Sequence, residues 1–269
     1  MKLSYTTLSV KDRNIHEAIG IACKNKLDGI ELRGMADSHV SCSSSFSYVS
    51  DIKHMLADAG LVVPCLTSYE KLNHVNLMDA EKDIDSLLHT IELADYLSAK
   101  SIRIFMGKID CSDDISQIED NRALIMDRTE DSPVKIVIET HDSARTGSDL
   151  SGILKDAPDC YGVLWDIIHP WYMGESYQET WNLIGKRVFH MHIKDVRERL
   201  TEPLHDYCEI GKGVIPVKDI VNHVISNGYA GFFSLEWEPS SSGYEGISFE
   251  DSISRFVPFM RSIDNENSV

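Results

Sequence analysis

The chain has 269 residues, which suits one large α/β domain, and its 42% of hydrophobic and 26% of charged residues exclude an intrinsically disordered protein. The formal net charge of −17 repels phosphate backbones, so we expect no nucleic-acid partner. None of the six cysteines forms a CxxC pair, the first residues read as a strand rather than a signal peptide, and no apolar run reaches membrane-spanning length. We therefore expect a cytoplasmic protein with no membrane partner.

Segments with the composition of strands alternate with segments of helical spacing along the first half of the chain. The expected strands span residues 2–10, 27–34, 61–69 and 101–107. The expected helices span residues 12–26, 79–98 and 113–128, and a further helix before residue 61 is expected to end at residues 59–60. Asp12 is placed to cap the first helix, and Gly60 suits the C-terminal end of the second.

The same alternation continues to the end of the chain. The expected strands span residues 134–141, 163–170, 188–195 and 231–239, and the expected helices lie near 150–155, 176–185, 215–229 and 247–260. Eight strand–helix pairs with near-continuous apolar strands predict a parallel sheet covered by helices, closed as a single (β/α)8 TIM barrel over residues 1–269. An open doubly wound sheet is the alternative, but no GxGxxG follows the first strand.

Each of the last four predicted strands carries one acid or histidine near its C-terminal end, namely Glu139, Asp166, His192 and Glu236. Burying such groups costs free energy, and in a parallel barrel the C-terminal strand ends meet at the active face. One divalent metal bound by all four side chains would offset that cost. Three carboxylates and one imidazole suit Mn²⁺, which we prefer, or Mg²⁺, Co²⁺ or Zn²⁺, and do not suit a closed structural zinc site.

The alternation of side chains along a strand brings further polar groups to the same face. Lys194 lies on one side of its strand with His192, and Glu31 shares a side of the second strand with Arg33. We expect Lys194, Arg33 and Glu31 to contact substrate. A plain ion pair between Glu31 and Arg33 stays open, as does a structural pairing of Lys194 with Asp195 or Glu236.

The ordered segments IETH, DIIHP, HMHIKD and IGKGVIPVKDIV…NGYAGFFSLEWE are similar to those of the xylose isomerase-like TIM barrels, specifically the sugar isomerase/epimerase branch. The similarity covers essentially the whole chain and is strongest from residue 134 to residue 239. It implies the same four metal ligands and a substrate contact by His169. It also implies that Glu139 and Glu236 act as the catalytic acid/base pair.

The resemblance implies a metal-dependent sugar isomerase or epimerase of carbohydrate metabolism, which acts on a small sugar or keto-polyol. Proton removal next to a carbonyl would give a metal-stabilised enediolate, and the site of proton return would decide between epimerisation and isomerisation. Loss of a β-hydroxyl instead would make the enzyme an inosose- or dehydroshikimate-type dehydratase, an alternative that the HIKD form with Lys194 favours. The family's arginine six residues after His192 is replaced here by Glu198, between Arg197 and Arg199, so the subtype stays open.

Zinc-dependent apurinic endonucleases share this barrel, and a DNA-repair enzyme is the less favoured alternative. Their three-metal cluster needs extra histidines after the third and fourth strands and a late Asp-x-His, whereas here those strands end in TSY and FMG and the late segment reads HDYC from His205. A barrel that binds a ligand without turnover is a further alternative. Dimers and tetramers are common among similar proteins, so a homo-oligomer stays open.

Overall fold

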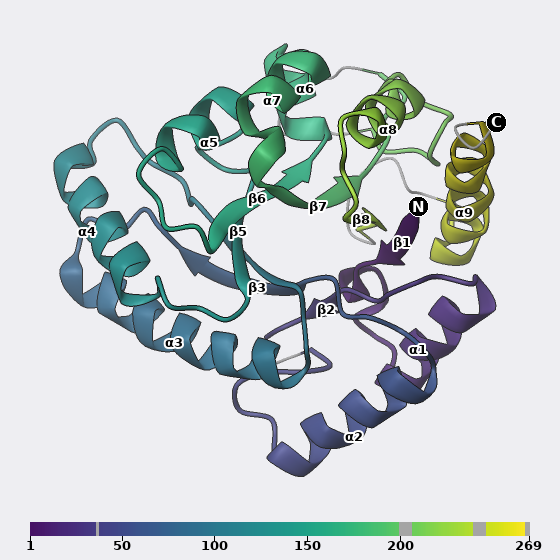
Figure 1. Ribbon diagram of the computed structural model, residues 1–269, viewed down its shortest axis with the longest axis horizontal. Coiled ribbons are helices and arrows are strands. Elements are labelled where there is room, and N and C mark those ends of the chain that lie inside the picture. Colours follow the sequence, from purple (N-terminus) through teal and green to yellow (C-terminus); the bar gives the residue numbers. More distant parts are fainter. Residues whose placement is uncertain (36–37, 199–205, 239–245, 267–269) are drawn as a thin grey trace.

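A computed structural model describes residues 1–35, 38–198, 206–238 and 246–266 (Figure 1). The strands in these ranges are β1 (Lys2–Tyr5), β2 (Leu32–Arg33), β3 (Leu66–Lys71), β4 (Ser101–Phe105), β5 (Lys135–Glu139), β6 (Tyr161–Asp166), β7 (Val188–Ile193) and β8 (Phe232–Leu235). They form one parallel sheet in the order β1-β8-β7-β6-β5-β4-β3-β2. This sheet confirms the predicted (β/α)8 barrel.

Helices surround the sheet (Figure 1). The α-helices are α1 (Ile15–Lys24), α2 (Phe46–Asp58), α3 (Leu77–Tyr96), α4 (Ile115–Arg128), α5 (Gly147–Ile153), α6 (Ile168–Met173), α7 (Tyr177–Ile184), α8 (Val217–Ser226) and α9 (Phe249–Glu266). Two 3₁₀ turns accompany them, η1 (Thr7–Val10) and η2 (Gly185–Arg187). In the part of the chain that the structure describes, no helix combines the length and the apolar character that a membrane span requires.

The ring closes between β1 and β2, the two ends of the strand order. Thr6 and Glu31 form a parallel bridge there. The Glu31 amide donates to the Tyr5 carbonyl at 2.9 Å, and the Thr7 amide donates to the Glu31 carbonyl at 2.8 Å. The backbone of Glu31 is therefore fixed from both sides of the closure, so its side chain enters the barrel from a rigid position.

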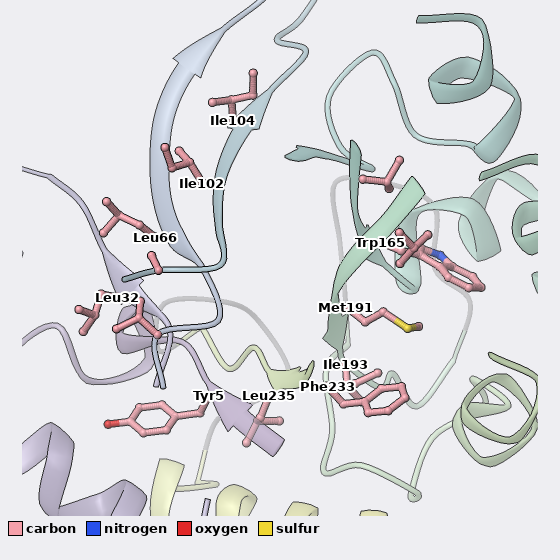
Figure 2. Packing of buried hydrophobic residues seen from close by; sticks show 14 of the residues in the cluster. Tyr5, Leu32, Leu66, Ile102, Ile104, Trp165, Met191, Ile193, Phe233 and Leu235 are labelled. Carbon is pink, nitrogen blue, oxygen red and sulfur yellow. The ribbon is translucent and has the colours of Figure 1, made fainter. Parts of the chain in front are cut away.

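The apolar core lies mainly between the strands and the helices. Figure 2 shows the side chains of Leu66, Ile102, Met191 and Phe233 among those that make it up, all of them buried. A second, small cluster of Cys65, Val137 and Leu164 is separate from this layer. Because Met191 and Ile193 belong to the outer layer, the alternation along β7 directs His190, His192 and Lys194 into the barrel, as predicted.

Local hydrogen bonds make the structure differ from the prediction at three points. The first strand ends at Tyr5 instead of Val10, because the Thr6 side chain accepts from the Leu8 amide and begins η1. The cap of α1 is Asn14, not Asp12, since Asn14 and Glu17 form a reciprocal capping box. The sixth strand stops at Asp166, whose Oδ1 accepts from the Ile168 amide at 3.1 Å, and α6 begins where a continued strand was expected.

Candidate active site

The four predicted metal ligands come together at the C-terminal ends of β5 to β8. Glu139 and Asp166 are the last residues of their strands, His192 is the second-last residue of β7, and Glu236 directly follows β8. The register places Asp166 beside His192. All four side chains are buried, and one ligand atom from each lies within 4.8 Å of the others.

His192 stands at the centre of this group. Its Nδ1 lies 2.7 Å from Glu236 Oε2 and 3.2 Å from Glu139 Oε1. Burial lowers the pKa of His192, but the negative charges of Glu236 and Glu31, and the hydrogen bonds that its ring donates to Glu139 and Glu236, raise the pKa well above its usual value. Burial raises the pKa of Asp166 to about 6, although the Lys194 ammonium opposes this rise. The clustered carboxylates thus repel one another unless nearby positive charges offset them.

Two buried cations supply part of that charge. Lys194 Nζ lies 3.0 Å from Asp166 Oδ2, 2.9 Å from Glu236 Oε2 and 3.0 Å from Glu238 Oε1. Arg103 Nη1 lies 3.3 Å from Glu139 Oε2. Arg103 was not anticipated, although a charged residue in the middle of the apolar run SIRIF, between the outward-facing Ile102 and Ile104, was a signal for it.

The donor set fits a divalent cation. The buried carboxylates of Glu31, Glu139, Asp166 and Glu236 outnumber the buried cations Arg103 and Lys194 by two charges. Without a metal, protonation of His192, whose pKa is raised, offsets part of this excess, and a bound divalent ion would replace that proton. Asp166 Oδ2 and Glu236 Oε2 are buried and both face the single Lys194 ammonium, at 3.0 and 2.9 Å. One hard divalent ion would balance both the charge and these oxygens, and carboxylate and imidazole groups are its ordinary ligands.

The remaining predicted residues surround this group at different depths. His169, in α6, has its Nε2 3.7 Å from Asp166 Oδ2, and its ring stands edge-on to His141 at 4.7 Å. Arg33, at the end of β2, donates from Nε to the Tyr69 hydroxyl at 2.9 Å. Glu31 lies completely buried. The structure thus brings His169 and Lys194 to the ligand group, while substrate contacts by these residues and by Arg33 and Glu31 stay predictions.

The loop after β7 is held by one buried carboxylate. Asp195 accepts from the amides of Val196, Gly211 and Gly213, each at 2.9 Å, and from that of Ile215 at 3.2 Å. A Cβ at Gly213 would meet Asp195 Oδ1 at 2.1 Å, so glycine is required for this close approach. A structural pairing of Lys194 with Asp195 is therefore wrong, because Asp195 binds the loop backbone.

The same segment also reaches Lys194. It carries Tyr207, whose ring lies 5.7 Å from Lys194 Nζ. Arg197 pairs with Asp206. Arg199 and His205 lie outside the described residues.

Comparisons with known proteins agree with this architecture. A family model described as xylose isomerase-like TIM barrel matches residues 21–256. No curated protein matches the sequence. Similar solved structures include the probable 3-DHS dehydratase AsbF of Bacillus anthracis, which is 18% identical with a TM-score of 0.81, the match covering 97% of this chain and 99% of that one.

Two further solved structures share the fold along nearly their whole length. A D-tagatose 3-epimerase-like protein is 18% identical with a TM-score of 0.78 and full coverage of both chains. The IolI protein, with a bound zinc atom, is 18% identical with a TM-score of 0.80, and the match covers 98% of each chain.

Proposed function

The chain belongs to the xylose isomerase-like TIM barrel family, and from that premise we propose that it is a metal-dependent sugar isomerase or epimerase. Its substrate would be a small sugar or keto-polyol, and its reaction would be proton transfer on a carbon next to a carbonyl. The observation that carries this proposal is the pair of buried carboxylates, Glu139 and Glu236, which reach the same His192 nitrogen from β5 and from the end of β8.

The environment of each glutamate supports an acid/base role. Burial raises the pKa of Glu236, but His192 and Lys194 lower it well below its usual value. Burial likewise raises the pKa of Glu139, and the Arg103 guanidinium and His192 outweigh it and lower the pKa. Both carboxylates are therefore ionised in the absence of substrate, so either is free to act as the base once a reacting carbon lies beside it. Glu139 would take the proton from one face of the carbon and keep it, and Glu236, protonated from solvent before the step, would deliver its own proton to the other face. The two roles would exchange in the reverse direction.

We propose Glu139, Asp166, His192 and Glu236 as the ligands of one divalent metal, preferably Mn²⁺. When bound, this ion would supply the positive charge that stabilises an enediolate. The zinc atom named in the IolI structure supports divalent binding by a barrel of this kind. His169 and Arg33 would orient the substrate hydroxyls beside the ligand group.

Dehydration is a second candidate reaction, and the position of Lys194 favours it. Burial lowers the pKa of Lys194, but Asp166 and Glu236 raise it well above its usual value, so the ammonium stays protonated. An ammonium at this place could donate a hydrogen bond to a departing β-hydroxyl, and the glutamate that has removed the neighbouring proton could deliver that proton to it as water leaves. The fold shared with the probable 3-DHS dehydratase is consistent with this chemistry.

Other expectations stay predictions. These are a single domain over residues 1–269, a cytoplasmic location, a homo-oligomer and the lack of a nucleic-acid partner. A nuclease activity is not proposed, because β3 and β4, which end at Lys71 and Phe105, carry none of the additional histidines that a three-metal cluster needs.

Incubation with Mn²⁺ in D₂O, with a panel of ketoses, inososes and dehydroshikimate-like acids, tests the proposal. We expect one substrate class to exchange a carbon-bound hydrogen for deuterium, detected by NMR and mass spectrometry. Deuterium in a recovered or rearranged sugar would identify an epimerase or isomerase, and a product lighter by one water would identify a dehydratase. If no compound exchanges while the protein holds its metal, the proposal is wrong.

A further inference from the structure

A second polar group lies beneath the proposed metal ligands, inside the barrel. Glu31 Oε2 accepts a hydrogen bond from His190 Nε2 at 2.7 Å, and Glu31 Oε1 accepts one from His192 Nε2 at 2.9 Å. The side chains of all three residues are buried, Glu31 with an exposed fraction of 0%. A carboxylate is costly to bury so deeply, so its retention in an otherwise packed interior calls for an explanation.

His192 belongs to both groups, and its two ring nitrogens face in different directions. Nε2 faces Glu31, while Nδ1 faces Glu139 and Glu236. The Glu31 backbone is fixed by the closure between β1 and β2, and His192 is fixed in β7. The bond between them therefore crosses the barrel interior and joins two rigid elements.

We propose that Glu31 is a positioning residue for the metal site, an inference that rests on the proposed metal-dependent function. By accepting the Nε2–H of His192, Glu31 would keep the proton on that nitrogen and leave the Nδ1 lone pair directed at the metal position. Histidine ligands commonly donate their second N–H to a carboxylate in this way, which fixes the tautomer and the ring orientation. His190 would occupy the other oxygen of Glu31 and keep its carboxylate from rotating.

The alternative is a second metal bound by Glu31, His190 and His192, whose ligand atoms also lie close together. The distances of 2.7 and 2.9 Å are those of charge-assisted hydrogen bonds, in which both imidazoles donate. A second metal would need both Nε2 protons removed. It would also need His192 to bind one metal through each nitrogen, which requires an imidazolate. The hydrogen-bonded arrangement needs neither.

The substitution Glu31→Gln tests this role, because the glutamine amide keeps the volume but its single carbonyl oxygen cannot satisfy both imidazole N–H groups. We expect the dissociation constant for Zn²⁺ alone, measured by equilibrium dialysis with a competing chelator, to rise about 10-fold to 100-fold. Leu87→Ala is the matched control, since Leu87 is buried on α3 away from the site. It should lower the melting temperature and leave the Zn²⁺ affinity unchanged. An unchanged affinity in folded Glu31→Gln would overturn the inference.

Wild-type protein provides a second measurement that does not depend on the folding of a variant. In Zn²⁺-loaded protein with ¹⁵N-labelled histidine, long-range ¹H–¹⁵N NMR should show His192 bound to zinc through Nδ1 with its proton on Nε2. Zinc bound to Nε2 would contradict the proposed role of Glu31. If wild-type protein bound no Zn²⁺ or Mn²⁺, the proposed function itself would fail, and this result is distinct from an unchanged affinity in Glu31→Gln.

Discussion

Glu139→Gln is expected to slow solvent deuterium exchange into substrate by about 100-fold to 10,000-fold, the usual contribution of a positioned acid/base group. The amide keeps the shape of the carboxylate and one oxygen ligand, but it cannot take up a proton. Arg103, 3.3 Å from Glu139 Oε2, would lose its anionic partner without leaving the site. The exchange rate by NMR, measured together with metal content, separates loss of the base from loss of the metal.

Glu238→Gln is the matched control for this experiment. Glu238 is a neighbouring glutamate that pairs with Lys194 at 3.0 Å, but its side chain is 32% exposed and it is not one of the four clustered ligands. We expect Glu238→Gln to keep the exchange rate within a few-fold of wild type. Full exchange in Glu139→Gln, with a large loss in Glu238→Gln, would reverse the assignment of the catalytic acid.

Removal of the divalent metal by a chelator is expected to abolish exchange and to lower the melting temperature. Because the ion binds only the folded site, a concentration about 1,000 times its dissociation constant stabilises the fold by about 4 kcal/mol. At roughly 2–4 °C per kcal/mol for a chain of this size, the shift would be on the order of 10 °C. Differential scanning calorimetry with and without Mn²⁺ gives this quantity directly.

Asp166→Ala serves as the reference for that shift. Asp166 is one of the four clustered carboxylate and imidazole groups, and its buried Oδ2 lies 3.0 Å from Lys194 Nζ. The melting temperature of the Asp166→Ala variant should change little when Mn²⁺ or the chelator is added. A wild-type melting temperature that is independent of added metal would show that the buried charges are balanced by protein groups alone.

The barrel could be predicted because its signals are local. Apolar strands with period-2 alternation, separated by helical segments, specify parallel strands and the face that each side chain occupies. The placement of the four clustered side chains follows from the same pattern. Glu139, Asp166, His192 and Glu236 each lie near the C-terminal end of a strand, and the C-terminal ends of parallel strands lie at one end of the barrel. Nothing beyond strand position and parity was needed to bring them together.

The remaining features depend on contacts between residues far apart in the sequence. Glu31 is 159 positions from its partner His190, and no local pattern relates them. Asp195 follows β7 as an ordinary loop acid, yet it accepts four amides from residues 196–215. Two helix starts, the cap of α1 at Asn14 and the beginning of α6 after Asp166, depend on which of several adjacent polar side chains accepts a backbone amide. Helix propensity alone does not determine which side chain does so.

The most direct test of the central claim is the metal content of the purified chain, measured by equilibrium dialysis against Mn²⁺ followed by elemental analysis. The account predicts one tightly bound divalent ion per wild-type chain and loss of that ion when Asp166 and His192 are both replaced by alanine. A folded wild-type chain that retains no ion, or a double variant that binds as tightly as wild type, would contradict it.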